Sequence, residues 1–509
     1  MTKRFLPLLA FLALAGCSGP NNKAEIKLAT PSPQQIDFMN NEIGAFFHFT
    51  TNTFTGAEHG DGTATPADFN PTKLDVDQWM EAAKSLGAKY AVLTARHEDG
   101  FCLWPTKTTE YCVRNSPWKN GRGDVVKEFV EACRRHGIKP GLYFSPNYNG
   151  HEIFQPKDRP VEWGKVWDSI TNLRWQDSAF VQKYRQLEVD QITELLTDYG
   201  PIYQIWMDHW SEKKNCPAVT AAIRKLQPEC ILTGPDVRSP GNEKGTVVYP
   251  SWNPVYTMDS TNNSRAAERV DEPEGPNEYG LLETYKIVGH PNGQFWRSLE
   301  APTADMFNHG GWFWHGPQLP MPMDDRIENY YRSVGLGANL IINLPPDRQG
   351  LIPAETVADA KAWGDTIRKL FYGPFIAETE TAQPGSEVEL TWEKPCRIDH
   401  VMLMENIANG QKVANYTLEA FVDGKWQAVV PANRFKYCPE GYNASPGFET
   451  IGHKKIDRIV PVVTDKLRFR CTKAAAEPIE IAKFAVWNVG EANLIQTANH
   501  DSYTHLLAN

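Results

Sequence analysis

Length and composition describe a large globular chain with an acidic balance. It has 509 residues, of which 41% are hydrophobic and 22% are charged, and its formal net charge is -10 at pH 7. This length exceeds what one hydrophobic core usually supports, so two domains are expected. The negative charge and the lack of a basic run exclude a nucleic-acid partner, because phosphate binding needs clustered Lys and Arg.

The N-terminus has the pattern of an export signal. Two basic residues precede the apolar run 5–15, and the run ends at Ala15-Gly16-Cys17. A small-residue pair before Cys at the end of such a segment is similar to the bacterial lipobox, in which the Cys is lipidated. We expect residues 1–17 to be a lipoprotein signal peptide with Cys17 as the lipid anchor. The alternative is ordinary cleavage, which would release a periplasmic protein.

Residues 18–33 are polar, contain three Pro and are interpreted as a tether between lipid and domain. The expected location is therefore that of an exported bacterial lipoprotein, in the periplasm or on the outer-membrane surface. Export permits disulfides, and Cys102 and Cys112 are close enough in sequence to be candidates. Buried free thiols are the alternative, because a chain of this size folds without such cross-links.

From residue 43 to about residue 370, short apolar runs alternate with amphipathic helical segments that end in Gly or Pro. This pattern is typical of a parallel (β/α)8-type barrel, whose active site lies at the carboxyl ends of the strands. We therefore expect a catalytic barrel over 34–373, with long loops over that face at 247–293. The eight runs predicted to be strands are 43–49, 90–94, 141–145, 202–207, 230–233, 294–297, 311–314 and 339–344.

After residue 373 the pattern changes to alternating runs separated by turn residues, as at 387–391, 416–422 and 466–471. Alternation with a period of two predicts half-buried strands. We expect residues 374–509 to form an antiparallel β-sandwich. Its structural support of the barrel is favoured over polysaccharide binding, because no aromatic platform is evident.

The sequence lacks the residue spacings that several kinds of catalytic site require. His48 has no neighbouring His, His97 has no partner four residues away on a helix, and no Cys-x-x-Cys pair occurs, so no metal is expected. A Gly-x-Ser-x-Gly elbow and a Gly-rich phosphate loop after a strand are also missing. No cofactor is therefore expected.

Carboxylates at the ends of predicted strands remain. Asp208 directly follows the run 202–207, which places it on the catalytic face of a barrel. Glycoside hydrolysis needs a second carboxyl group to protonate the leaving oxygen. Glu243, in the loop after the next predicted strand, is one candidate, and Glu300 is its rival. Each of the three could instead be a solvated or structural carboxylate.

Four motifs closely resemble the alpha-L-fucosidases of glycoside hydrolase family 29. They are Gly44-Ala45-Phe46-Phe47-His48-Phe49, Thr94-Ala95-Arg96-His97-Glu98-Asp99-Gly100-Phe101, Gly141-Leu142-Tyr143-Phe144-Ser145 and Ile205-Trp206-Met207-Asp208. The resemblance implies that Asp208 is the nucleophile of a retaining enzyme. The segment 234–243 resembles the branch that prefers alpha-1,3 and alpha-1,4 linkages, which implies Glu243 as acid/base. The family resemblance also implies that the sugar-binding pocket is formed by His48, Glu58, Arg96, His97, Tyr143 and Trp206.

The sequence departs from the family pattern at several of these places. Glu98 stands where the family often has a second His, and His59 stands where it often has Trp. His209 and Trp210 follow the nucleophile in place of a small residue. Ser239 and Pro240 stand before Gly-Asn-Glu in place of an aromatic residue. The chemistry is retained, and the substrate preference is the property that these changes affect.

The expected function is an exo-acting retaining alpha-L-fucosidase that removes terminal fucose from glycans and needs no cofactor. Asp208 would attack the anomeric carbon, and Glu243 would protonate the departing oxygen and then activate water. Two alternatives stay open. One is a surface lipoprotein that binds fucosylated glycans with weak turnover, and the other is a glycosidase acting on alpha-L-galactosides.

Overall fold

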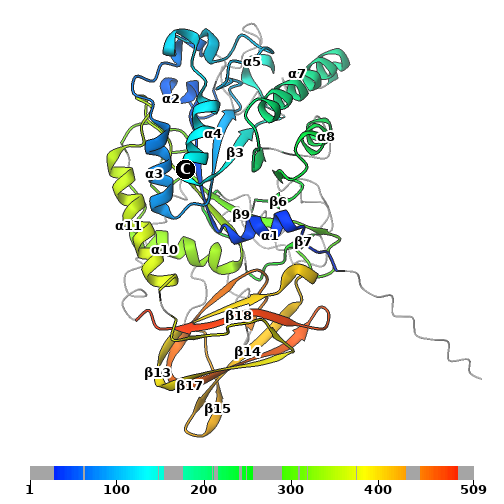
Figure 1. Ribbon diagram of the computed structural model, residues 1–509, viewed down its shortest axis with the longest axis vertical. Coiled ribbons are helices and arrows are strands. Elements are labelled where there is room, and N and C mark those ends of the chain that lie inside the picture. Colours follow the sequence, from blue (N-terminus) through cyan, green and yellow to red (C-terminus); the bar gives the residue numbers. More distant parts are fainter. Residues whose placement is uncertain are drawn as a thin grey trace, which may run out of the picture.

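The computed structural model describes residues 28–60, 63–146, 148–153, 176–208, 210, 216–239, 243–247, 249–255, 289–307, 310–317, 319–373, 375–431 and 448–490. In these ranges the chain forms a closed barrel and an antiparallel β domain, one above the other in Figure 1. The predicted signal peptide, Cys17 and most of the tether lie outside the described residues.

Eight parallel strands close the barrel in the order β1-β10-β9-β6-β5-β4-β3-β2, which confirms the predicted barrel. Each hydrogen-bonded pair around the ring is parallel. The strands are β1 (Ile43–Phe47), β2 (Tyr90–Arg96), β3 (Lys139–Phe144), β4 (Gln204–Met207), β5 (Ile231–Thr233), β6 (Val237–Arg238), β9 (Ser298–Thr303) and β10 (Asn339–Asn343).

Two of the eight predicted strands are wrong. The run 294–297 contains β8 (Phe295–Trp296), which pairs with β7 (Pro254–Val255) in a separate two-stranded sheet, and the barrel strand β9 begins just after it. The run 311–314 is a loop, and β6 takes a place in the ring instead. Two residues of β6 are too few to give a periodic signal, whereas the aromatic run 312–314 has the composition of a strand.

Helices surround the barrel: α7 and α8 lie on one side of it in Figure 1, and α3 and α11 lie on the other. Asp75 and Asp124 cap the first turns of α3 and α4, and Gly87 and Gly137 end these helices with positive φ angles of 96° and 69°. The helices are α1 (Pro33–Asn40), α2 (Thr51–Thr55), α3 (Val76–Leu86), α4 (Val125–His136), α5 (Gly150–Ile153), α7 (Ser178–Thr197), α8 (Cys216–Leu226), α10 (Met323–Tyr331) and α11 (Ala354–Phe371).

The second domain is an eight-stranded antiparallel sheet with the main order β11-β18-β13-β17-β14-β15. The long strands β13 and β17 change register twice, and residues of β13, β14, β17 and β18 share one apolar core, as in the predicted sandwich. The strands are β11 (Ala377–Glu378), β12 (Gln383–Pro384), β13 (Glu387–Glu405), β14 (Val413–Val422), β15 (Lys425–Ala428), β16 (Phe448–Glu449), β17 (Lys455–Ala474) and β18 (Glu480–Trp487).

The two domains are joined by buried and partly buried polar contacts on α10 and α11. Arg458 of β17 forms a two-point ion pair with Glu328 of α10, at 2.9 and 3.1 Å. The hydroxyl of Tyr331 lies 2.6 Å from Nε2 of His400, and the Trp487 indole donates to the Leu370 carbonyl at 2.9 Å. These contacts make the second domain a support for the barrel.

Cys102 and Cys112 are both buried free thiols, so the suggested disulfide does not form. They do lie on neighbouring backbone segments, joined by an isolated β-bridge. No helix in the described ranges is long and apolar enough to cross a bilayer.

Candidate active site

Asp208 directly follows β4, at the carboxyl end of the barrel strands. Tyr143 of β3 donates its hydroxyl hydrogen to Oδ2 of Asp208 at 2.6 Å. The Tyr143 ring stacks on Trp206, with the ring centroids 5.6 Å apart and the planes 12° apart. Both aromatic rings are almost fully buried, whereas Asp208 is partly exposed. The structure thus gives Asp208 a fixed hydrogen-bond donor and access to solvent.

His48 and His97 complete the buried side of this group. His97 stacks on Tyr143 at 5.0 Å, and the His48 ring lies 5.6 Å from His97. Burial lowers the pKa of His48 well below its usual range, and the neighbouring His97 adds to that effect, so His48 is neutral. A neutral imidazole offers one donor and one acceptor, which suits a sugar hydroxyl.

The tautomer of His48 follows from its neighbour Asn343. The Asn343 amide nitrogen donates to the carbonyl of Trp312 at 2.8 Å, which turns its Oδ1 toward Nδ1 of His48 at 3.0 Å. Nδ1 therefore carries the hydrogen, and Nε2 is left as an acceptor. Sequence reasoning missed Asn343, because nothing in the run 339–344 separates a pocket residue from a strand residue.

Glu243 reaches the same group through Trp312. The Trp312 indole donates to Oε2 of Glu243 at 3.1 Å, and its ring centroid lies 4.7 Å from that of His48. Glu243 is exposed and has a positive φ of 53°, an uncommon conformation for Glu. Asp208 and Glu243 therefore border one aromatic cluster, composed of His48, His97, Tyr143, Trp206 and Trp312.

Glu58 anchors the loop that carries Trp312. Its two carboxylate oxygens accept hydrogen bonds from the Trp312 backbone N–H at 2.6 Å and from Nε2 of His315 at 2.9 Å. The family resemblance implies that Glu58 lies in the sugar pocket, whereas the sequence pattern assigns Trp312 to a strand and gives it no role in the site. The signal that could have found Trp312 is the Gly-Gly-Trp-Phe-Trp-His run itself, since paired Gly residues favour a turn over a strand.

Two departures from the family pattern meet at the edge of this site. Nδ1 of His59 lies 2.8 Å from Oε2 of Glu98, and the His59 side chain is 49% exposed while that of Glu98 is 7% exposed. The hydrogen bond to Glu98 raises the pKa of His59, and the charges of Glu98, Glu58 and Asp208 raise it further. A polar pair thus lies within reach of the charges of Glu58 and Asp208, at positions where the family often has Trp and His.

Arg96 does not join the other predicted pocket residues. A register shift between Thr94 and Arg96 turns its side chain out of the barrel wall toward α7. There the buried guanidinium pairs with Glu188 at 3.2 Å, donates to Gln191 at 2.8 Å and lies over the Phe144 ring. Arg96 ties β2 and β3 to α7, and we do not retain it as a sugar-binding residue.

Glu300 points into the barrel interior and is 1% exposed. It accepts hydrogen bonds from the Tyr90 hydroxyl at 2.6 Å and from the Trp206 indole at 2.7 Å, and the Gln204 amide lies 3.4 Å away. Burial raises the pKa of Glu300 to about 7. Both oxygens are engaged beneath Trp206, which favours Glu243 as the carboxyl available to a leaving group.

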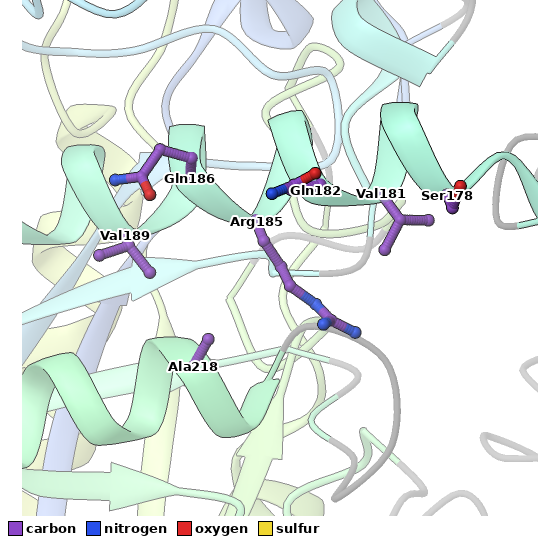
Figure 2. Close-up of a pocket in the computed structure, with 7 residues that line it drawn as sticks. All are labelled: Ser178, Val181, Gln182, Arg185, Gln186, Val189 and Ala218. Carbon is purple, nitrogen blue, oxygen red and sulfur yellow. The ribbon is translucent and has the colours of Figure 1, made fainter.

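Two cavities in the described part of the chain lie apart from Asp208 and Glu243. One, of about 440 Å³, lies between α7 and α8 (Figure 2) and is lined by Ser178, Val181, Gln182, Arg185, Gln186, Val189 and Ala218. The other, of about 400 Å³, lies near the amino end of β3 around Lys139 and Tyr203. The first contains no carboxyl group, and neither contains a residue of the site. In the ranges that the structure describes, no three His, Cys, Asp or Glu side chains are placed to hold a metal ion.

Known proteins are similar to this chain in sequence and in fold. The family model described as alpha-L-fucosidase matches residues 21–369. Alpha-L-fucosidase 1 of Arabidopsis thaliana is 29% identical over 89% of this chain and 86% of its own. A glycoside hydrolase 29 family member from a rumen bacterium superposes with a TM-score of 0.72 at 28% identity, covering 94% of this chain and 80% of that one. A fucosidase of Ruminococcus gnavus in complex with fucose, 22% identical, shares the fold with a TM-score of 0.69 over 90% of this chain and 95% of that one.

Proposed function

The chain belongs to the alpha-L-fucosidase family and is a glycoside hydrolase, and from this premise we propose that it removes terminal fucose from glycans with retention of anomeric configuration. The observation that carries the proposal is the pair of carboxylates on one aromatic cluster. Asp208 is held by the Tyr143 hydroxyl, and Glu243 is held by the Trp312 indole. Aromatic faces suit the apolar side of a pyranose, and the neutral His48 suits its hydroxyls.

In the proposed mechanism, Asp208 attacks the anomeric carbon and the bond to the aglycone oxygen breaks as Glu243 gives that oxygen its proton. A glycosyl ester on Asp208 results. Glu243 then takes a proton from water, whose oxygen displaces Asp208 and releases fucose. The Tyr143 hydroxyl stabilises ionised Asp208 before attack and after release. Two inversions at one carbon give net retention.

Substitution of the acid/base tests this assignment. Glu243→Gln should lower kcat/KM on fucosyl oligosaccharides by roughly a thousandfold, since a positioned general acid contributes 10²–10⁴. The first step on an aryl fucoside with a good leaving group should be spared, and azide should partly restore turnover. Glu300→Gln is the matched control and should show neither the large loss on oligosaccharides nor a recovery of turnover with azide. If Glu300→Gln showed this behaviour and Glu243→Gln did not, the assignment would be wrong.

The linkage preference is proposed as alpha-1,3 and alpha-1,4, from the likeness of segment 234–243 to that branch. Residues 240–242 of this segment lie outside the described ranges. Release of fucose from Lewis-type trisaccharides should exceed release from 2-linked fucosyllactose by at least tenfold in kcat/KM, a difference of about 1.4 kcal/mol in transition-state binding. Equal kcat/KM values on the two substrates would contradict the proposed linkage preference.

A second candidate function is hydrolysis of alpha-L-galactosides, whose sugar differs from fucose by one hydroxyl at C6. The His59–Glu98 pair favours it, because a polar pair can bind an added hydroxyl that an apolar wall would exclude. Aryl alpha-L-fucoside and aryl alpha-L-galactoside should be compared as substrates of the wild type. A higher kcat/KM on the galactoside would make this the main activity.

We also propose that the enzyme is a lipoprotein anchored through Cys17, in the periplasm or at the outer-membrane surface. In a bacterial host, Cys17→Ala should move the protein from the membrane fraction to the soluble fraction and abolish incorporation of labelled palmitate. Membrane retention of Cys17→Ala without label would contradict the anchor.

A further inference from the structure

The buried carboxyl of Glu300 is not used by the mechanism above. It lies on β9 inside the barrel, and in the described part of the chain no cation pairs with it. Its partners are three donors, on Tyr90, Gln204 and Trp206. Burying a carboxyl among apolar rings is costly unless its hydrogen bonds are made, so the position calls for a reason beyond filling space.

One of these donors belongs to the wall of the active site. Trp206 stands two residues before Asp208 and stacks on Tyr143, whose hydroxyl donates to Asp208. The Phe46 ring lies 5.5 Å from Trp206 and 6.0 Å from Tyr143, so both rings are packed from the barrel interior as well. The Glu300–Trp206 hydrogen bond adds a polar contact to the indole within this packing.

We propose, on the basis of the proposed function, that Glu300 is a positioning residue. By holding the indole nitrogen of Trp206 from below, it sets the Trp206–Tyr143 stack and thereby the donation of the Tyr143 hydroxyl to Asp208. Glu300 touches neither the sugar nor the reacting atoms. It acts through two aromatic side chains that meet the pocket, and small displacements of such groups are costly for catalysis.

The other two donors show why a carboxyl serves here. Oε1 accepts from Tyr90 while Oε2 accepts from Trp206, and Gln204 lies within 3.5 Å of both oxygens. The carboxyl group of Glu300 thus links a side chain of β2 to a side chain of β4. The raised pKa is compatible with this role, since a neutral carboxyl keeps an acceptor for the indole.

Four variants assayed on an aryl alpha-L-fucoside test the proposal. Glu300→Met keeps the length of the side chain and removes both acceptors, and kcat should fall about ten- to a hundredfold. The acid limb of the kcat/KM profile should also move to higher pH, because the hydrogen bond from the Tyr143 hydroxyl to Asp208 would be weakened. Glu300→Gln keeps one acceptor for the indole and should restore kcat to within about threefold of wild type.

Tyr90→Phe is the matched control, since it removes another donor from the same carboxyl and leaves Trp206 in place. It should lower thermal stability while the pH profile stays in place. If Glu300→Met does not fold, Glu300→Asp replaces it, because Asp withdraws the acceptor by one methylene and should give the same pH shift with a smaller loss of kcat.

Wild-type kcat and an unmoved acid limb in the folded Met or Asp variant would overturn the proposal. An acid-limb shift in Tyr90→Phe as large as that in Glu300→Met would also overturn it, because the effect would then be general loosening of the core. No turnover by the wild type on aryl fucoside or galactoside would instead overturn the proposed function, and this inference with it.

Discussion

At the scale of single residues, the site depends on partners that come from other strands. Asp208 could be predicted because a carboxylate directly after an apolar run lies at the carboxyl end of a barrel strand. Its donor Tyr143 lies 65 residues earlier, and periodicity in one segment carries no information about such a contact. The family resemblance supplied Tyr143 and also supplied Arg96, which the structure turns away from the pocket.

Arg96 shows the physical limit of that reasoning. Strict alternation along a strand assigns each residue to one face, and the register shift after Thr94 breaks the alternation. In this position the buried guanidinium pairs with Glu188. The sequence carries no mark of the bulge, so the error could not be corrected from the motif alone.

A pH-dependent stability follows from Glu300. Burial raises its pKa from 4.5 to about 7, so the folded protein binds a proton there that the unfolded chain releases. The stabilisation is complete below the unfolded pKa and is lost as pH rises through the folded pKa. Relative to Glu300→Gln, the wild type should lose on the order of 3 kcal/mol of unfolding free energy between pH 4.5 and pH 7.

Urea unfolding at several pH values would measure this difference. Glu81→Gln, at an exposed position of α3, is the control and should leave the pH dependence as it is in the wild type. A difference between wild type and Glu300→Gln that stayed constant with pH would show that Glu300 does not titrate in this range.

At the scale of elements, the barrel could be predicted but its closing strands could not. Six predicted runs overlap the barrel strands β1, β2, β3, β4, β5 and β10. The ring closes through β6, which has two residues, and through β9, which begins after a run that had been assigned to the barrel. The geometry of barrel closure determines where such short strands form, and this geometry depends on all eight strands together.

The packing inside β1 gives a prediction at this scale. Gly44 lies opposite Tyr90, and a Cβ atom at Gly44 would lie 2.6 Å from Cε2 of the Tyr90 ring. Gly44→Ala must therefore displace the ring whose hydroxyl binds Glu300, at a cost of about 3 kcal/mol of unfolding free energy.

Gly335→Ala is the matched control, because its nearest foreign atom lies 3.5 Å from the added Cβ. It should change the unfolding free energy by less than about 1 kcal/mol. Equal effects of the two substitutions in denaturant unfolding would mean that the Gly44 approach to Tyr90 does not constrain the barrel.

At the scale of the whole molecule, the second domain is part of the structural support of the barrel. Glu42, just before β1, forms a partly buried ion pair with Lys454, and Gln411 binds the backbone of Asn253 and Ser251 in the loops beyond Glu243. The sandwich could be predicted from alternation, and these contacts could not, since they join residues as far apart as 412 positions.

We expect the two domains to unfold in one transition. Trp487→Phe keeps an aromatic ring and removes the N–H donated to the Leu370 carbonyl, which should cost about 1 kcal/mol and lower the midpoint of that single transition. Trp426→Phe on β15, away from this interface, should have a smaller effect. Two separate transitions in calorimetry, with Trp487→Phe shifting only one, would contradict a shared folding unit.

The central claim is that Asp208 forms a covalent bond to the sugar, and mass spectrometry of a trapped intermediate tests it most directly. The wild type would be incubated with a 2-deoxy-2-fluoro fucosyl fluoride, digested and mapped. The account predicts a fluorofucosyl ester on Asp208 and on no other carboxylate, with no label in Asp208→Asn. A label on Glu243 or Glu300, or fast turnover of this reagent with no trapped ester, would contradict it.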